Sequence, residues 1–282
     1  MDAGWGTSSP QPTDAMRSQM KSHSDSSSTA GPCKPRPSVS ARGPRGRLVF
    51  SLLATCMTCL AAAAGAGAAG ASSHVQATQE LAVLLTPHAV HTGPATASPQ
   101  RTVLADRRPI TGAPTTLPVI SRSIGADGSR WLQVMLPGRP NGSTGWIAEQ
   151  DTSAVLTPWY IVVRIRARRV NIYDDGHLAR SFRAVVGKLS TPTPTGQFFV
   201  EEAVTMATGE PGGPFALALS ARSDALQEFE GGPGQIAIHG IENLGGTPGK
   251  AESHGCIRLA TAAIDWIAAR IGAGTPVTIE HG

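Results

Sequence analysis

Cysteine and charge are both scarce in this sequence of 282 residues. It contains four cysteines, and only 16% of its residues are Asp, Glu, Lys or Arg. Three of the cysteines lie in the first 60 residues, so the rest of the chain has Cys256 alone and cannot hold a disulfide framework. A solitary thiol is either a buried, inert residue or a reactive nucleophile, and the count by itself leaves both interpretations open.

A basic charge that would favour nucleic acid is also lacking outside the N-terminal segment. Residues 1–71 hold seven Lys or Arg and three acidic residues, whereas residues 72–282 hold 17 of each sign. This balance argues against nucleic acid as a partner. Within the neutral part, residues 101–183 are cationic and residues 184–282 are acidic. This uneven distribution of charge has two interpretations. Either it orients the protein on an anionic polymer, or the charged residues simply form ordinary solvated surfaces.

The N-terminal segment resembles a leader. Residues 1–47 have no apolar period, which predicts a disordered tail that ends in a positively charged n-region. The apolar run 48–64 and the small residues up to position 71 are typical of a signal-peptide h-region and cleavage zone. We therefore expect export. Since about 17 apolar residues are the lower limit for a membrane span, an uncleaved signal anchor at 48–64 is the alternative. A lipid anchor at Cys56 fits less well because Thr55 precedes it.

Glycine and proline are abundant, with 32 and 22 residues, and favour turns and strands over long helices. Residues 72–100 are predicted to be a linker. Residues 101–152 contain short apolar runs and turns, which predict several short strands. A strand with Trp131, a polar turn and then Gly145-Trp146-Ile147 resembles bacterial SH3-like domains. This resemblance implies a small β-barrel at 101–152 that binds the cell wall or acts as a spacer.

Residues 158–282 predict a second, mainly β domain with one packed helix. Apolar runs and the turn Asp174-Asp175-Gly176 indicate a hairpin, and residues 235–240 predict another strand. The segment 207–234 is rich in glycine and proline and is predicted to be a long loop that acts as a lid or a binding loop. A helix is predicted from Thr261, the expected N-cap, because the residues after it have an apolar stripe at helical spacing.

The chemistry concentrates around Cys256, which follows Ser253-His254-Gly255. A cysteine nucleophile needs a base, or a cation that lowers its pKa, and His254 and His239 are the candidate bases. It also needs backbone donors for the oxyanion, which the flexible Gly255 would help to converge. A zinc site with the same residues is disfavoured because only Glu242 and Glu252 are nearby as further ligands.

Three segments carry a resemblance to YkuD-type L,D-transpeptidases. They are His239-Gly240, the run Ser253-His254-Gly255-Cys256-Ile257-Arg258, and the stretch 191–198, Thr-Pro-Thr-Pro-Thr-Gly-Gln-Phe. The resemblance implies a β-sandwich catalytic domain at 158–282. It implies roles for the following residues: Cys256 as the nucleophile, His239 as its general base, Ser253, His254 and Gly255 for the oxyanion and for orientation, and Arg258 and Gly240 in contact with substrate.

The same resemblance implies a function in the cell wall or the periplasmic space. The enzyme would act on peptidoglycan stem peptides through a Cys256 thioester and form 3→3 cross-links, without a metal or organic cofactor. Carbapenem β-lactams would acylate the same thiol. The alternatives are an L,D-carboxypeptidase, an enzyme of the same fold that attaches proteins to peptidoglycan, and a non-catalytic wall-binding protein.

Overall fold

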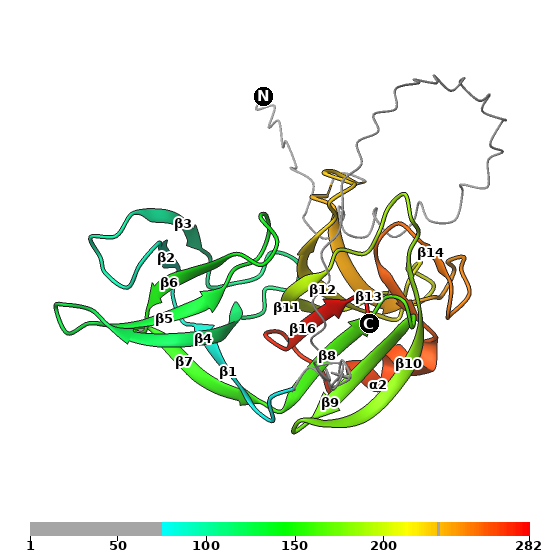
Figure 1. Ribbon diagram of the computed structural model, residues 1–282, viewed down its shortest axis with the longest axis horizontal. Coiled ribbons are helices and arrows are strands. Elements are labelled where there is room, and N and C mark those ends of the chain that lie inside the picture. Colours follow the sequence, from blue (N-terminus) through cyan, green and yellow to red (C-terminus); the bar gives the residue numbers. More distant parts are fainter. Residues whose placement is uncertain (1–74, 230–231) are drawn as a thin grey trace, which may run out of the picture. The chain divides into compact units, whose positions relative to one another are not determined.

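The computed structural model describes residues 75–229 and 232–282. The predicted tail and signal segment, residues 1–71, lie outside the described residues. Among the residues that are described, no helix is both long and apolar enough to cross a membrane. Strands dominate this part of the chain, which confirms the mainly β prediction (Figure 1).

An antiparallel sheet of seven strands forms the N-terminal domain, in the order β3-β2-β6-β5-β4-β1-β7. It begins well before residue 101, because the segment 72–100 that we expected to be a linker contains two strands. Their burial comes from partners far away in the sequence, chiefly β4 and β6, which a local pattern does not reveal. The likeness to SH3-like domains stays a prediction. The strands are β1 (Gln79–Leu84), β2 (His88–His91), β3 (Gln100–Leu104), β4 (Thr116–Ile124), β5 (Arg130–Met135), β6 (Thr144–Ala148) and β7 (Thr152–Thr157).

A sheet of nine strands forms the C-terminal domain, in the order β14-β10-β15-β13-β12-β11-β16-β8-β9. An additional pairing of β9 with β10 closes this sheet on itself. The strands are β8 (Trp159–Arg164), β9 (Arg169–Asp174), β10 (His177–Gly187), β11 (Gly196–Thr205), β12 (Phe215–Arg222), β13 (Gln235–Gly240), β14 (Ala251–Ser253), β15 (Ile257–Leu259) and β16 (Pro276–Glu280).

Strand β10 joins the two layers of this domain. Its first part, up to Arg183, pairs with β9, and residues 184–185 pair with β15. The register shifts near Leu178 and again near Gly187, which lets the strand bend from one layer to the other. The predicted hairpin at Asp174-Asp175-Gly176 connects β9 to β10.

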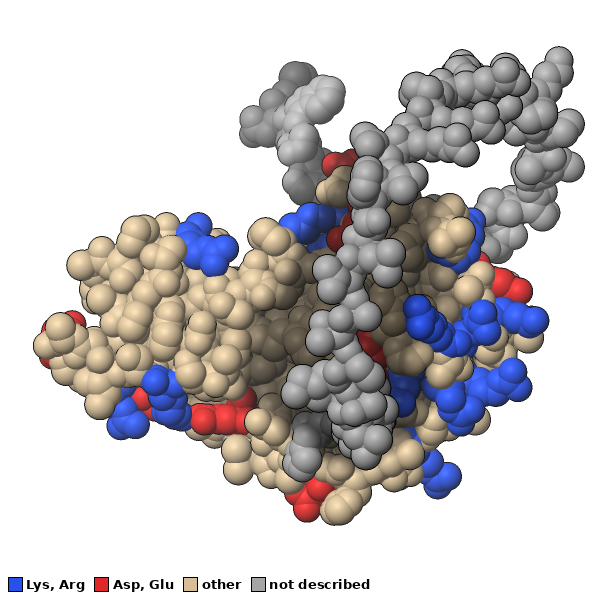
Figure 2. Space-filling model, viewed as in Figure 1, with Lys and Arg blue, Asp and Glu red and all other residues tan. Residues whose placement is uncertain are grey.

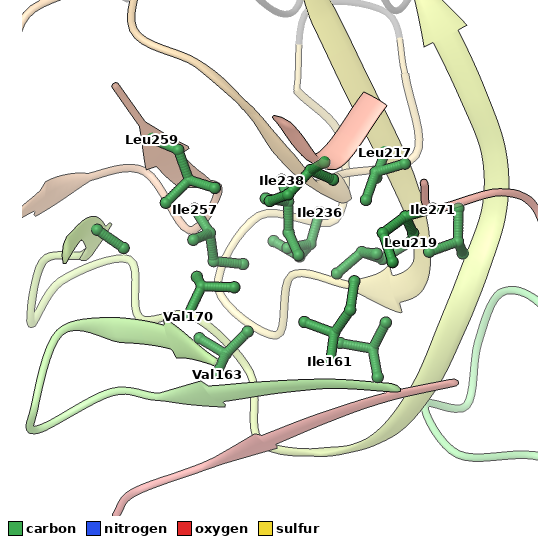
Figure 3. Packing of buried hydrophobic residues seen from close by; sticks show 14 of the residues in the cluster. Ile161, Val163, Val170, Leu217, Leu219, Ile236, Ile238, Ile257, Leu259 and Ile271 are labelled. Atoms are coloured by element: carbon green, nitrogen blue, oxygen red, sulfur yellow. The ribbon is translucent and has the colours of Figure 1, made fainter. Parts of the chain in front are cut away.

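The core of the C-terminal domain lies between the two layers. In Figure 3, Ile161, Val163 and Val170 point from β8 and β9 toward Leu217, Leu219, Ile236 and Ile238 on β12 and β13. Each of these side chains is at most 1% exposed. The arrangement of two facing layers agrees with the predicted sandwich.

Strand β12 corrects one prediction. It lies inside the segment 207–234, which we expected to be a single loop. All eight of its residues are buried, since β11 and β13 flank it and both of its faces are covered. A strand buried on both faces has no alternation of apolar and polar residues, and the small side chains of Ala216, Ala218 and Ala221 weakened the apolar signal.

The predicted helix is α2 (Thr261–Ala268), which packs Ala263, Ile264 and Ile267 on the core. It differs from the prediction at its start. The N-cap residue is Ala260 and no side chain caps the helix, so Thr261 is the first helical residue. Tertiary packing of the apolar stripe, rather than capping, therefore holds this short helix in place.

Strand β11 carries the contact between the two domains. Its Phe198 and Val200 face the C-terminal core, whereas Phe199 packs in the core of the N-terminal sheet. Glu201, on the same side as Phe199, pairs with Arg108 of the N-terminal domain and, at 2.9 Å, with Arg222. The period of two along a strand explains how Phe198, Phe199 and Val200 serve both domains. The register of β11 shifts between Val200 and Glu202, which lets the consecutive Glu201 and Glu202 both contact the N-terminal domain.

The uneven charge noted in the sequence produces a cationic surface. Lys and Arg side chains gather on the region of Figure 2 where β10 and β14 lie. Arg164, Arg169 and Arg183 lie in register on β8, β9 and β10. Arg164 pairs with Glu280 at 3.3 Å, and Arg169 donates to the Ser181 hydroxyl at 2.9 Å. These contacts are typical of a solvated strand face.

The pair between Arg108 and Glu201 tests the domain contact. We predict that Arg108→Ala lowers the free energy of unfolding by about 3 kcal/mol, because it leaves a buried carboxylate with one cation fewer. The matched control is Arg130→Ala, since Arg130 is 70% exposed and pairs with Glu149 at 2.8 Å. An exposed pair of this kind contributes about 1 kcal/mol or less. Urea unfolding of both variants measures the difference, and equal losses would contradict the prediction.

Candidate active site

Two parallel strands set the geometry of the site. Strand β13 pairs with β15 so that Ile238 lies opposite Ile257 and His239 lies opposite Arg258. The two isoleucines point into the core of the domain. Because successive side chains alternate between faces, His239 and Arg258 project together from the other face of the sheet.

Cys256 lies immediately before β15 and reaches the same face. Continuing the register by one residue places it opposite Ala237, and both residues belong to one small apolar cluster. His239 follows Ala237 by two residues, so it is the diagonal neighbour of Cys256. With neighbouring strands about 4.8 Å apart and about 3.3 Å of rise per residue, their Cα atoms are separated by about 8 Å. Cys256 as a whole residue is partly exposed, although its thiol is desolvated.

The His239 imidazole is fully buried and held in one orientation. Its Nδ1 lies 2.7 Å from the carbonyl oxygen of Gly240. Since a carbonyl can only accept, Nδ1 carries the proton and Nε2 keeps its lone pair. Nε2 has no hydrogen-bond partner within the described part of the protein. Burial, together with the positive charge of Arg258, lowers the pKa of His239 from 6.5 to about 4. The ring is therefore neutral at pH 7.

Two glycines allow the loop after β11 to lie against this ring. A Cβ atom on Gly240 would meet the Gly213 carbonyl oxygen at 1.9 Å, and one on Gly212 would lie 2.8 Å from the His239 ring nitrogen Nδ1. Gly240 therefore orients the histidine through its carbonyl and permits a close backbone approach. Gly212 and Gly213 were not identified from the sequence, because glycine is common throughout this segment.

Arg258 is a buried cation beside the thiol. It is 3% exposed, donates through Nη1 to the Gly245 carbonyl, and its Nε has no partner among the described residues. Burial raises the pKa of the Cys256 thiol, and the Ala237 backbone N–H and the charge of Arg258 partly oppose that rise. The cysteine and the histidine are thus both neutral at pH 7, with a guanidinium placed to stabilise a thiolate once it forms.

The turn before Cys256 is held by Ser253. Its hydroxyl donates to the Cys256 carbonyl at 2.6 Å and accepts from the Gly255 N–H at 3.2 Å. Gly255 has a φ of +122°, a conformation that favours glycine. We expected Ser253, His254 and Gly255 to line an oxyanion site, and this role stays a prediction. In the structure the Gly255 amide is engaged within the turn. Ser253 and Gly255 therefore shape the approach to the sulfur.

The stretch 191–198 braces the same turn. The Thr193 hydroxyl donates to the Gly255 carbonyl at 2.8 Å and accepts from the Gly187 N–H at 2.9 Å. The Thr191 hydroxyl donates to the Ser253 carbonyl at 3.4 Å. The sequence identified this stretch as a motif but gave no role for its threonines, since their partners are about 60 residues away in the chain.

His254, the second candidate base, makes contacts outside the pair formed by Cys256 and His239. Its Nε2 lies 3.1 Å from the Lys188 ammonium, and its ring stacks on Phe229 at a centroid distance of 6.0 Å. Burial and the charge of Lys188 lower the pKa of His254. Lys188 was not identified from the sequence, because a single lysine near a turn has no distinguishing pattern.

Metal ligands are not gathered at this site. In residues 75–229 and 232–282, no three His, Cys, Asp or Glu side chains come close enough together to hold an ion.

Comparisons with known proteins find L,D-transpeptidases. The family model of the L,D-transpeptidase catalytic domain, YkuD, matches residues 158–279. The chain is 29% identical over 168 residues to YkuD of Bacillus subtilis, a match that covers 56% of this chain and 92% of that relative. The corresponding protein of Bacillus licheniformis is 28% identical over 167 residues. The family match spans nearly all of the C-terminal domain and supports the resemblance found in the sequence.

Solved structures of L,D-transpeptidases are also similar to the chain. L,D-transpeptidase 3 from Mycobacterium tuberculosis is 13% identical, with a TM-score of 0.38, and the match covers 59% of this chain and 91% of that one. The L,D-transpeptidase of Enterococcus faecium is 24% identical, with a TM-score of 0.34. That match covers 43% of this chain and 49% of the Enterococcus protein, about half of its length.

The brace formed by Thr193 gives a test of the site's architecture. We predict that Thr193→Val lowers the free energy of unfolding by about 1–3 kcal/mol, because it leaves a buried N–H and a buried carbonyl without their partner. It should also change the rate at which iodoacetamide alkylates Cys256. Thr195→Val is the matched control, since Thr195 is exposed in the same stretch. If the two variants behave alike in unfolding and alkylation, Thr193 does not support the turn.

Proposed function

We propose that this protein is a peptidoglycan L,D-transpeptidase that works through a thioester on Cys256. The observation that carries the proposal is the buried His239, whose Nδ1 is bound to the Gly240 carbonyl and whose Nε2 is unpartnered on the face of Cys256. A neutral imidazole with a free lone pair, one diagonal position from a thiol on the same face of the sheet, has the chemistry that a cysteine nucleophile requires of its base. The match of the C-terminal domain to the transpeptidase family model supports the choice of substrate.

In the first step, Nε2 of His239 takes the proton of the thiol while the sulfur attacks a carbonyl of the donor stem peptide. That carbonyl belongs to the third stem residue, a diamino acid. Its bond to the terminal D-alanine breaks, and the imidazolium returns the proton to the departing amine. The Ala237 N–H and the Arg258 guanidinium stabilise the negative charge on sulfur before attack. We assign the carboxylate of the departing D-alanine to Arg258, whose Nε is free to donate.

In the second step, the side-chain amine of a neighbouring stem peptide attacks the thioester. The C–S bond breaks, a 3→3 amide cross-link forms, and the thiol regains a proton. Water as the acceptor would make the protein an L,D-carboxypeptidase, and an amine on a protein would make it an attaching enzyme. The reaction needs no metal or organic cofactor. Export by the segment 48–71, or anchoring by 48–64, belongs to the same proposal because the substrate lies outside the membrane.

Acylation by a carbapenem tests the nucleophile. We expect the full chain to gain the mass of one carbapenem, since opening of the β-lactam ring leaves the whole molecule attached to sulfur. Cys256→Ala should gain no mass, whereas the exposed-site control His177→Ala should react as the parent does. Intact-protein mass spectrometry measures both. An adduct that persists in Cys256→Ala would overturn the assignment.

The choice of acceptor has its own experiment. The full chain is incubated with a disaccharide-tetrapeptide, and the products are identified by mass. We expect a cross-linked dimer and free D-alanine. A disaccharide-tripeptide without dimer would instead indicate hydrolysis, and an unchanged substrate would favour the non-catalytic wall-binding protein.

The pH dependence of acylation tests the role of His239. Because the imidazole must be neutral to accept the proton, the rate of acylation should fall as the pH drops through about 4 and stay nearly level from about pH 5 to 8. His239→Ala should be slower by about 10²–10⁴-fold and should lose this step. The measurement is the loss of carbapenem absorbance over a pH series. A midpoint near the usual histidine value would show that the imidazole is not desolvated in the working enzyme.

A further inference from the structure

A loop of the N-terminal domain reaches the apolar cluster that contains Cys256. This loop, residues 105–115, connects β3 to β4. Its Ile110 packs, together with Val204 and Cys256, against the buried members of the cluster on β12 and β13 and just after β11, which are Met206, Ala216, Ala218 and Ala237. The apolar cluster that Cys256 packs against therefore has members from both domains.

The loop is fixed to the catalytic domain on both sides of Ile110. Arg108 pairs with Glu201, and its Nε lies 3.6 Å from a carboxylate oxygen of Glu202. Thr111 donates to Glu202 through its backbone N–H at 2.9 Å and through its hydroxyl at 3.0 Å. Both glutamates are 2% exposed, so these contacts are shielded from water. The polar contacts of Arg108, two residues before Ile110, and of Thr111, the next residue, thus hold Ile110 against the cluster.

The loop also has internal structure. The Arg108 N–H donates to the Ala113 carbonyl at 2.8 Å, and the Gly112 N–H donates to the Arg108 carbonyl at 2.9 Å. Arg107 and Pro114 form an isolated bridge at its base. Because the loop is held by its own hydrogen bonds and by pairs with the other domain, we expect the Ile110 side chain to have one position. Ile110 itself is partly buried.

The other members of the cluster explain why Ile110 matters. Three of its four buried members are alanines, and one of these, Ala237, lies opposite Cys256 in the strand register. The larger Ile110, Val204 and Met206 side chains extend beyond the alanine methyl groups, so the cluster is an apolar surface with short and long members. Such a site accepts a short apolar group and excludes an ammonium or a carboxylate, which would lose its hydration there. Of the groups next to the bond that breaks in the proposed reaction, only the methyl group of the terminal D-alanine is short and apolar.

We propose that Ile110 is a specificity-determining residue that forms one wall of a subsite for the methyl group of the donor's terminal D-alanine. The inference rests on the proposed function and assigns the N-terminal domain a part in substrate selection. The polar contacts of Arg108 and Thr111 position the wall. In this proposal Arg258 binds the carboxylate of the terminal D-alanine, and Ile110 contacts its methyl group.

The test compares two donors on the full chain: a disaccharide-tetrapeptide that ends in D-alanine and one that ends in glycine. The parent should favour the D-alanine donor in kcat/KM by about tenfold or more, the usual effect of one methyl group in an apolar pocket. Ile110→Ala should bring this ratio close to one, and Ile110→Val should restore most of it. Ile124→Ala is the matched control, since Ile124 is in the same domain and is 74% exposed.

The ratio separates this role from a purely structural one, because lost stability lowers activity on both donors equally. Urea unfolding of each variant accompanies the kinetics. If Ile110→Ala keeps the parent's ratio, as Ile124→Ala should, the subsite is refuted even though the enzyme is active. If the parent itself forms neither a carbapenem adduct nor any peptide product, the proposed function fails instead. The two failures are therefore distinguishable.

Discussion

The pairing of β13 with β15 is the constraint on which the site depends. Parallel alignment of these two strands places His239, Arg258 and the approach to Cys256 on one face while their neighbours fill the core. A shift of the register by one residue would turn the imidazole into the hydrocarbon and an isoleucine toward the thiol. The buried isoleucines that fix the register therefore also fix the chemistry.

Desolvation then sets the protonation states. Burial disfavours charge on both members of the cysteine–histidine pair, lowering the pKa of His239 and raising that of Cys256. The positive charge of Arg258 lowers the pKa of both groups. It therefore favours the thiolate form of Cys256 and disfavours the imidazolium form of His239. The resting site is thus neutral apart from one guanidinium. In the proposed reaction, the substrate carboxylate and the developing thiolate would both meet a positive field that is already in place.

The sequence predicted most of the C-terminal domain because its signals are local. The hairpin turn at Asp174-Asp175-Gly176, the apolar stripe of α2 and the segment around Cys256 can each be identified in a few residues. Strands β1, β2 and β12 escaped detection because their burial is created by distant partners. The same reason hid Thr193 and Lys188, whose partners lie about 60 residues further along the chain. The hydrogen bond from the Gly255 N–H to the Ser253 hydroxyl depends on the rotamer of that serine, which a sequence pattern does not predict.

Phe199 has a consequence for how the protein can be divided. Its ring is 1% exposed and lies among the apolar side chains of the N-terminal sheet, although it belongs to a strand of the other domain. Separating the chain at the natural boundary near residue 157 would leave an aromatic ring and two carboxylates uncovered on β11. The two halves thus share part of a core, and a C-terminal half transferred to another protein would need polar substitutions or a new covering surface at β11.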